Sequence, residues 1–323
     1  MPPSPAKAAS LREPGRLPRC DGPRQAGRFT ENGSQRSDMS GLKATVLPER
    51  GVLRIGGADA RPFLQGLITN NIDLVEDGRA IYAGLLTPQG KFLFDFFVHA
   101  DGDTLLLDCD GTRAADLLKR LNFYKLRAQV TLDDLGATHA VATYWGADAA
   151  PAGAVADPRF AGLGFRAIAP KSANLLDGAE AATPADYHRH RIVLGVGDAH
   201  RDFEPDRTFP LEVNFDELNG IDFKKGCFVG QEVTSRTKRR GSVRKRLLPV
   251  LVEGNLPKPH TPVRSSGREA GMIFSGDTET SRALALLRLD LIDGAVLEAG
   301  DASLTPEKPV WATFELEGEA DEA

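Results

Sequence analysis

The chain has 323 residues, of which 41% are hydrophobic and 26% are charged, and its formal net charge at pH 7 is −5. This composition is ordinary for a globular protein, and the length is sufficient for two or three domains. No stretch approaches the ~20 apolar residues that a membrane-spanning helix needs, so we predict a soluble protein without a membrane partner. A net acidic chain is also poorly suited to indiscriminate nucleic-acid binding.

The three cysteines, Cys20, Cys109 and Cys227, are far apart and form no CxxC pair. Their odd number and wide spacing argue against a disulfide framework and against a self-contained zinc or cluster cage. A reducing compartment fits this cysteine usage best.

Residues 1–38 are rich in proline and arginine and have almost no apolar periodicity, which predicts a disordered tail. The arginines would also suit a transit peptide, although the acidic residues and prolines oppose an amphipathic helix. Met39 directly precedes the first regular stretch, so translation could start at Met1 or at Met39. We predict a bacterial cytoplasmic location, with the mitochondrial matrix as the alternative if residues 1–38 are a transit peptide.

The first regular elements follow from Val52 onwards. Short runs of apolar and β-branched residues predict strands at residues 52–55, 81–86, 92–98 and 105–108. Proline in second place and glycine in fourth place of Thr87-Pro88-Gln89-Gly90 suit a type I turn between the second and third of these strands. Asp59 and Thr112 are the predicted N-caps of two amphipathic helices.

Residues 147–183 are rich in alanine, glycine and proline, which predicts loops with a short strand at residues 164–169. Thr183 as N-cap, Pro184 at the first helical position and Gly195 past the end then predict a helix.

The C-terminal part has a different texture, because glycines and prolines separate short β-rich runs. These runs are residues 247–252, 270–274, 282–291 and 310–316. They predict a small C-terminal β-barrel that covers residues 244–316 and is followed by an acidic tail at residues 317–323.

The segment with the clearest chemistry surrounds Cys227. Lys224 and Lys225 directly precede it, and their positive charge would favour the thiolate, the form that attacks as a nucleophile and binds metals. Gly226 and Gly230 allow a close backbone approach or a positive φ. On local chemistry alone, Cys227 could instead be a small buried side chain, because free cysteine is often buried.

Residues 225–232, Lys-Gly-Cys-Phe-Val-Gly-Gln-Glu, resemble the K-G-C-[FY]-x-G-Q-E signature of the YgfZ family of folate-binding proteins. The family's other segments are resembled by residues 63–66, 69–70, 87–91, 209–212, 219–223 and 236–241. The resemblance extends from about Leu53 to the C-terminus. It implies an α+β fold like that of the glycine-cleavage T-protein, with residues 39–243 forming a folate-binding region of two subdomains around a central funnel, followed by the barrel.

The resemblance also implies a function and a site. The family supports assembly or repair of 4Fe–4S proteins, and its bacterial members affect tRNA thiolation. Cys227 would be the reactive residue. Tetrahydrofolate or a derivative would contact Lys225, Gly226, Phe228, Gly230, Gln231, Glu232, Glu212, Arg236 and Asp95. Glu212 would accept hydrogen bonds from the pterin, or alternatively face solvent, and Asp95 would lie in the funnel or on a solvated face.

One cysteine cannot hold a cluster alone, because four ligands are normally required. A shared cluster would therefore need a partner such as an A-type scaffold protein; the alternative is a redox-active thiol. No metal site formed by this chain alone is predicted.

Two other functions remain open at this stage. A folate-dependent aminomethyl or methyl transferase would need a carboxylate at the reacting amine, but the T-protein's acidic pair corresponds here to Phe94-Asp95, so one acid is missing. A tRNA-binding factor would use seven cations within eleven residues, which could also bind a folate tail, bind an acidic partner or form a solvated face. These cations are Arg236, Lys238, Arg239, Arg240, Arg244, Lys245 and Arg246.

Overall fold

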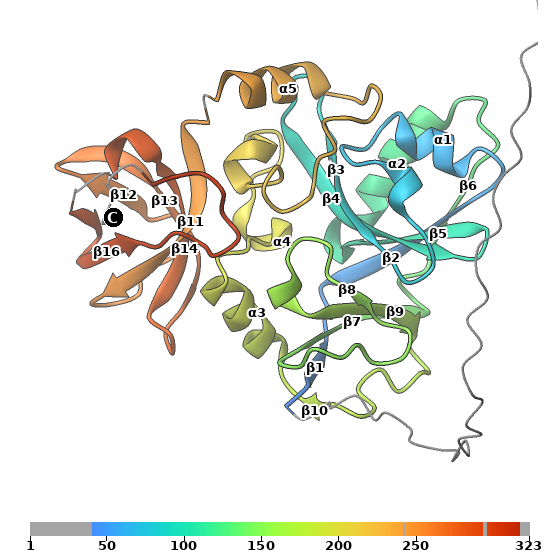
Figure 1. The fold of residues 1–323 in the computed structure, drawn as a ribbon, viewed down its shortest axis with the longest axis horizontal. Coiled ribbons are helices and arrows are strands. Elements are labelled where there is room, and N and C mark those ends of the chain that lie inside the picture. Colours follow the sequence, from blue (N-terminus) through green and yellow to red (C-terminus); the bar gives the residue numbers. More distant parts are fainter. Residues whose placement is uncertain (1–40, 242, 293–295, 317–323) are drawn as a thin grey trace, which may run out of the picture. The chain divides into compact units, whose positions relative to one another are not determined.

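The computed structural model of the chain describes residues 41–241, 243–292 and 296–316 (Figure 1). The predicted tail at residues 1–38, the alternative start at Met39 and the acidic tail at residues 317–323 lie outside these residues. Within the described ranges, no helix combines the length and the hydropathy needed to cross a membrane.

The first five-stranded sheet is antiparallel and has the order β3-β4-β5-β2-β6. Its strands span, in that order, Ile81–Leu86, Phe92–Asp101, Thr104–Asp110, Arg50–Gly56 and Thr131–Asp134. The predicted strands and the turn at Thr87–Gly90 are confirmed, and the N–H of Gly90 donates to the carbonyl oxygen of Thr87.

The two faces of this sheet differ because side chains alternate along each strand. Along β4, Phe94 and Phe96 pack into a hydrophobic core with α1 (Ala60–Gln65) and α2 (Ala114–Lys125). Asp95 lies on the opposite face of β4. Its carboxylate accepts a hydrogen bond from the hydroxyl of Tyr82, which belongs to a different hydrophobic cluster. One face of the sheet is therefore apolar, whereas the other carries buried charge.

The second sheet has the order β10-β1-β7-β9-β8. Its strands span, in that order, Glu180–Ala181, Lys43–Val46, His139–Trp145, Phe165–Pro170 and Val155–Ala156. Strands β1 and β10 pair in parallel, and the other neighbours pair antiparallel. Short 3₁₀ helices occur in this half of the chain at Ile72–Leu74, Gly111–Arg113 and Ala161–Leu163.

The helix predicted from Thr183 is α3 (Pro184–Val193), and it begins with a reciprocal capping box between Thr183 and Asp186. Asp59 is at the predicted N-cap position of α1 but its side chain forms no cap bond, and the predicted cap of α2 at Thr112 is wrong because the N-cap residue is Arg113. The carboxylate of Asp59 accepts from the N–H of Gln129 instead of capping α1, and Asp110 accepts from the N–H of Thr112 ahead of α2. A backbone N–H from a distant segment therefore binds the Asp59 carboxylate, and Asp110 caps the 3₁₀ turn that precedes α2.

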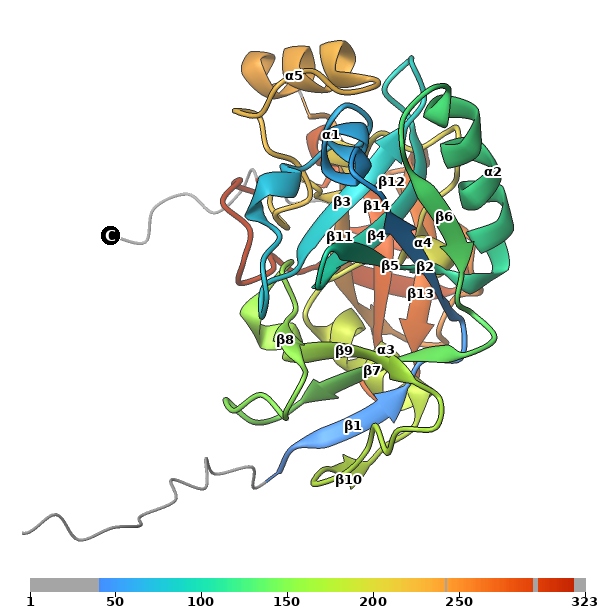
Figure 2. The same cartoon turned by 90° about the vertical axis from the view of Figure 1, so that its right-hand side faces the viewer.

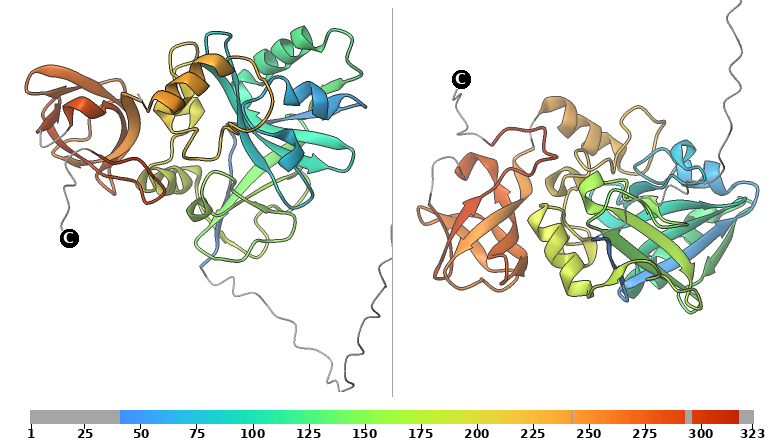
Figure 3. Two further views of the ribbon diagram at one scale, coloured as in Figure 1. Left: turned by 45° about the horizontal axis from the view of Figure 1, so that its top comes forward. Right: turned by 60° about the horizontal axis from the view of Figure 1, so that its bottom comes forward.

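The predicted β-barrel is closed and has the strand order β11-β14-β13-β12-β15-β16 (Figure 3). Its strands span, in that order, Lys245–Glu253, Arg282–Arg288, Arg268–Asp277, Pro262–Ser265, Leu297–Ala299 and Ala302–Pro306, with a 3₁₀ helix at Leu289–Leu291. The strand predicted at residues 310–316 is wrong. Trp311 instead donates to the carbonyl of Leu194, and Thr313 donates to Glu217, so this segment binds back onto the region before the barrel.

A second hydrophobic cluster joins the barrel to the first sheet. It contains Phe92 from β4, Phe215, Phe228, and Leu247 and Phe274 from the barrel. The segment that leads into the barrel contains α4 (Ala199–Asp202), the 3₁₀ helix η4 (Pro210–Val213) and α5 (Gln231–Arg240). Figure 2 shows α1 in front of the first sheet, with α5 above it and α2 at the right-hand edge.

Candidate functional site

The segment at residues 219–230, which we call the Cys227 loop, is held in place at its start by Thr69 and Asn70. The Thr69 hydroxyl donates to the carbonyl of Gly220 at 2.6 Å, and the Asn70 amide donates to the carbonyl of Asn219 at 2.7 Å. The N–H of Asp222 adds a bond to the carbonyl of Thr69 at 3.1 Å. Two adjacent polar residues after α1 therefore fix the entry of the loop.

Lys225 fixes the middle of the loop. Its Nζ atom donates to the carbonyl oxygens of Gln65 and Ile68, both at 2.7 Å, and of Asn70 at 2.9 Å. These carbonyls lie at the end of α1 and just beyond it, where backbone acceptors lack helical partners. Burial lowers the pKa of Lys225 to about 8. Because its ammonium group is bound by three backbone carbonyls, Lys225 anchors the loop, and its predicted contact with folate stays a prediction.

Gly230 fixes the end of the loop against the β3–β4 hairpin. Its φ is +82°, and a Cβ atom there would lie 2.5 Å from the carbonyl oxygen of Thr87. Gly90 in the hairpin also has a positive φ of +77°. Both positions need glycine because the two backbones touch. This contact brings together the two segments that resemble the family's hairpin and signature.

Phe228 and Gln231 complete the anchorage. Phe228 is buried in the cluster between the first sheet and the barrel, and its N–H donates to the Gln231 side-chain oxygen at 3.3 Å. Gln231 begins α5, whereas Glu232 on its first turn is exposed. These contacts give Phe228 and Gln231 a structural role, and the predicted contact of all three residues with folate stays a prediction.

Cys227 itself is exposed at the free part of this anchored loop, with Lys224 and Gly226 exposed beside it. No atom approaches the position of a Cβ on Gly226 within 4 Å. Cys109 is the opposite case: it is buried in the core, and burial raises the pKa of its thiol to about 12. Among the residues that the structure describes, no group of three or more His, Cys, Asp or Glu side chains could hold a metal ion. Cys227 can therefore offer one accessible sulfur to another molecule.

Glu212 lines a small cavity beneath α5. The cavity has a volume of about 190 Å³, and Val233, Thr237 and Arg244 also line it. The carboxylate accepts from the N–H of Phe209 at 3.1 Å, and burial raises its pKa above the ordinary value. The cavity is smaller than the ~300 Å³ typical of the smallest small-molecule pockets.

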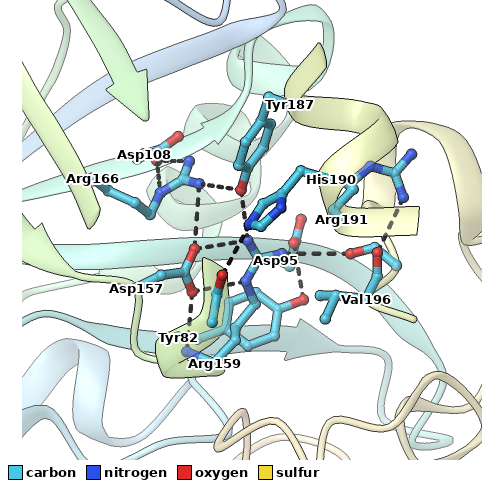
Figure 4. A network of polar contacts seen from close by, with 12 residues as sticks. Tyr82, Asp95, Asp108, Asp157, Arg159, Arg166, Tyr187, His190, Arg191 and Val196 are labelled. Carbon is cyan, nitrogen blue, oxygen red and sulfur yellow. Dashed lines mark hydrogen bonds and ion pairs between the residues drawn. The ribbon is translucent and has the colours of Figure 1, made fainter. Parts of the chain in front are cut away.

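Asp95 lies in a buried polar network between the two sheets (Figure 4). It is 6% exposed and accepts from the hydroxyl of Tyr82 at 3.0 Å. Burial raises the pKa of Asp95 to about 6, although the positive charge of Arg50 acts to lower it. A solvated face is therefore excluded for this carboxylate, and its contact with a ligand stays a prediction.

The rest of this network was not predicted from the sequence. Asp108 on β5 bonds to Arg50 on β2 and to Arg166 on β9, so it links the first sheet to the second. Burial would raise the pKa of Asp108, but the two guanidinium groups outweigh burial and lower it. Asp157 and Arg159 form a further buried pair at 2.8 Å. The sequence feature that could have indicated this network is Asp108, a charged residue within the apolar run from Leu105 to Cys109.

The run of seven cations does not form one free basic face. Arg246 is 4% exposed and bonds to Asp216 at 2.6 Å. Lys238 bonds to the same carboxylate at 2.8 Å. Arg236, Arg239 and Arg240 are exposed on α5. Arg236 is therefore accessible to a ligand as well as to solvent, and its predicted contact with folate stays a prediction.

Known proteins resemble this chain over most of its length. A human protein, the mitochondrial iron–sulfur cluster assembly factor IBA57, is 33% identical over 304 residues, which cover 82% of this chain and 84% of the human protein. The chain belongs to the IBA57 family. The mitochondrial IBA57 homologue of Mycosarcoma maydis is 34% identical over 265 residues, or 76% of this chain. The match spans 63% of that fungal relative's own length. The finer assignment to the YgfZ type stays a prediction.

Two further comparisons concern the fold of this IBA57 family member. Residues 244–314 match the family model of the CAF17 C-terminal beta-barrel domain. The crystal structure of the glycine cleavage system aminomethyltransferase T from Bartonella henselae matches with a TM-score of 0.66 at 13% identity, covering 82% of this chain and 84% of that one. The predicted T-protein-like α+β fold with a C-terminal barrel is confirmed, and this likeness concerns the fold alone.

Proposed function

We propose that this chain is an iron–sulfur cluster assembly factor, in which Cys227 supplies the single sulfur that contacts a cluster handled as cargo. The observation that carries this proposal is the exposure of Cys227 on a loop whose neighbours are anchored on both sides. Anchoring by Lys225 and Gly230 limits the positions that the sulfur can reach, and such pre-organisation favours binding to a second molecule. The names of the related proteins support a role in cluster assembly.

A single cysteine requires a partner, because four ligands normally hold a cluster. We propose that an A-type scaffold protein supplies the remaining ligands and that Cys227 joins them at the interface. A redox-active thiol is the alternative use of the same sulfur. The two uses differ in their spectra: a shared cluster gives iron–sulfur absorption in the complex that changes in Cys227→Ser, whereas a redox thiol leaves that absorption unchanged.

The test in cells uses a strain that lacks the native gene and is complemented with Cys227→Ser or with Cys109→Ala. We expect Cys227→Ser to leave 4Fe–4S enzyme activity near that of the empty vector. Cys109→Ala should restore it wherever the protein accumulates, because the buried Cys109 thiol is inaccessible. Full rescue by Cys227→Ser at equal protein level would remove the proposed role of the sulfur.

Tetrahydrofolate binding enters this proposal only through the resemblance and the T-protein-like fold. The described residues fit the ligand poorly: Asp95 is enclosed, Lys225 is bound to carbonyls, and Glu212 lines a cavity of about 190 Å³. We therefore derive no step through folate. Isothermal titration of the wild type, Glu212→Gln and Arg236→Ala with tetrahydrofolate tests binding, and loss of heat in either variant would support the predicted contacts.

No contact among the described residues favours the other two predicted functions. A transferase would need an accessible carboxylate at Asp95, which is 6% exposed, and tRNA binding would use a basic run in which Arg246 and Lys238 already pair with Asp216. Turnover with folate one-carbon donors would reinstate the transferase. Salt-sensitive tRNA binding would reinstate the tRNA-binding factor.

The names of both relatives describe mitochondrial proteins and give no support to a cytoplasmic location. We therefore propose the mitochondrial matrix, or the compartment that corresponds to it in the source cell, as the place of action. Fusion of residues 1–38 to a fluorescent protein tests whether they direct import.

A further inference from the structure

Two of the most exposed large apolar side chains of the described residues lie close together at the end of α2. Phe123 is 72% exposed and Leu126 is 89% exposed. We call residues 119–127 the α2 tip. Four cations belong to it, and none of their side chains forms a hydrogen bond or ion pair with the described residues; they are Lys119, Arg120, Lys125 and Arg127. Residues 117–130 contain no Asp or Glu, so the tip is both apolar and cationic.

The backbone at the α2 tip is strained. Leu126 has φ +44° and ψ −106°, a conformation that leucine rarely adopts because its Cβ atom clashes with the backbone. The folded chain gains no burial from this side chain, since it is almost fully exposed. Strain and apolar exposure at one position are a combination typical of binding sites.

α1 connects the α2 tip to the Cys227 loop. Beyond the N-terminal end of α1, the carboxylate of Asp59 accepts from the N–H of Gln129 at 2.7 Å, just after the α2 tip. At its C-terminal end, the carbonyl of Gln65 accepts from Lys225 of the Cys227 loop. A helix of six residues is only about 9 Å long. In Figure 2, α1 is drawn between α5 and α2.

A stable protein interface is larger than the exposed part of the Cys227 loop. A stable complex buries about 800 Å² on each partner, which is a patch roughly 30 Å across. The exposed part of the Cys227 loop is far smaller than that, so a partner seated on Cys227 must also cover neighbouring elements. One neighbour is the α2 tip, at the far end of α1. The other is α5, with exposed Arg236, Arg239 and Arg240.

We propose that the α2 tip is a second docking point for the cluster-carrying partner protein, beside Cys227. The partner fits if it presents acidic side chains around an apolar hollow that accepts Phe123 and Leu126. Its negative charge complements the four cations of the tip and the exposed arginines of α5, although the whole chain carries a net charge of −5. This inference rests on the proposed function, because it assumes a partner that brings ligands to Cys227.

The experiment measures the dissociation constant of the full chain for a purified, cluster-loaded A-type scaffold protein under anaerobic conditions. The variants are Leu126→Asn, Phe123→Ser/Leu126→Asn and Arg127→Glu. Because the Leu126 side chain is 89% exposed, Leu126→Asn removes no buried contact and should leave the thermal midpoint nearly unchanged. We expect Leu126→Asn to weaken binding at least fivefold, and the double variant and Arg127→Glu at least tenfold. Val310→Asn, at an 83% exposed apolar side chain, and Lys258→Glu are the matched controls.

The outcomes separate this inference from the proposed function. If the wild type binds the scaffold protein and Cys227→Ser weakens binding while the tip variants do not, the docking point is wrong and the function of Cys227 stands. If the wild type does not bind at all, both proposals are overturned. Wild-type binding to anionic phospholipid vesicles or to tRNA that is lost in the tip variants, with scaffold binding unaffected, would assign the tip to a lipid surface or to RNA and overturn the protein partner.

Discussion

Gly90 of the β3–β4 hairpin and Gly230 of the Cys227 loop touch backbone to backbone, since a Cβ atom on Gly90 would lie 3.0 Å from the carbonyl oxygen of Gly230. The two residues are 140 positions apart in the sequence, and both adopt positive φ. Their contact places the Cys227 loop against the β3–β4 hairpin. Gly230 of the signature therefore serves to position Cys227, whether or not a ligand binds.

Replacing Gly230 by alanine should destabilise the protein by about 2–5 kcal/mol, because positive φ and overpacking both penalise a side chain there. Gly226→Ala is the matched control, since its Cβ would meet open space and its φ is not positive. We expect the control to change the free energy of unfolding by less than about 0.5 kcal/mol. Urea unfolding of both variants provides the comparison. Equal destabilisation would contradict the hairpin contact.

Lys225→Ala should cost about 2–4 kcal/mol, because three carbonyl acceptors lose a charged donor. Lys224→Ala removes the exposed neighbouring lysine and should be nearly neutral. Hydrogen exchange adds a local measurement: the amides of residues 222–228 should exchange faster in Lys225→Ala alone. If both lysines behaved alike, Lys225 would have no anchoring role.

Asp95 should contribute to the pH dependence of stability with the opposite sign to carboxyl groups whose pKa is lowered in the folded protein. Its pKa is about 6 in the folded protein against an ordinary 3.8, so the folded state binds this proton more tightly than the unfolded state. The stability contribution of this group is therefore complete below pH 3.8 and is lost as pH rises through 6. The difference corresponds to about 3 kcal/mol.

The comparison of Asp95→Asn with the wild type isolates that contribution. From pH 4 to pH 7, the free energy of unfolding of the variant should rise relative to the wild type by up to about 3 kcal/mol. Other carboxyl groups such as Asp108, whose pKa is lowered, act in the opposite direction in both proteins and cancel. A difference between the two proteins that does not change with pH would show that Asp95 titrates normally.

Asp108 should be among the most sensitive charged positions of the fold. Asp108→Asn leaves Arg50 and Arg166 buried without their full counter-charge, and we expect a loss of about 3–5 kcal/mol. The exposed pair of Arg54 and Asp133 is the control, with both side chains 44% exposed. Asp133→Asn should cost less than about 1 kcal/mol. Thermal unfolding at several salt concentrations separates the pairs, because salt should weaken only the exposed one.

Local signals in the sequence were sufficient for much of the fold. The N-cap at Thr183, the hairpin turn at Thr87–Gly90 and the strand at residues 92–98 involve residues close together in the chain, and each was found in the structure. Periodicity failed at residues 310–316, where an apolar run contacts Leu194 and Glu217 instead of extending the barrel. That choice depends on a surface more than 90 residues away in the sequence.

The sequence by itself determined which residues form the candidate site, because the eight-residue signature around Cys227 is local and specific. Only the tertiary structure decided how they act. Lys225 turns to the carbonyls after α1 and Asp95 is enclosed among buried arginines, while Cys227 remains exposed. The reason is physical: the direction and the solvation of a charged side chain depend on partners from distant segments, and no local pattern specifies those partners.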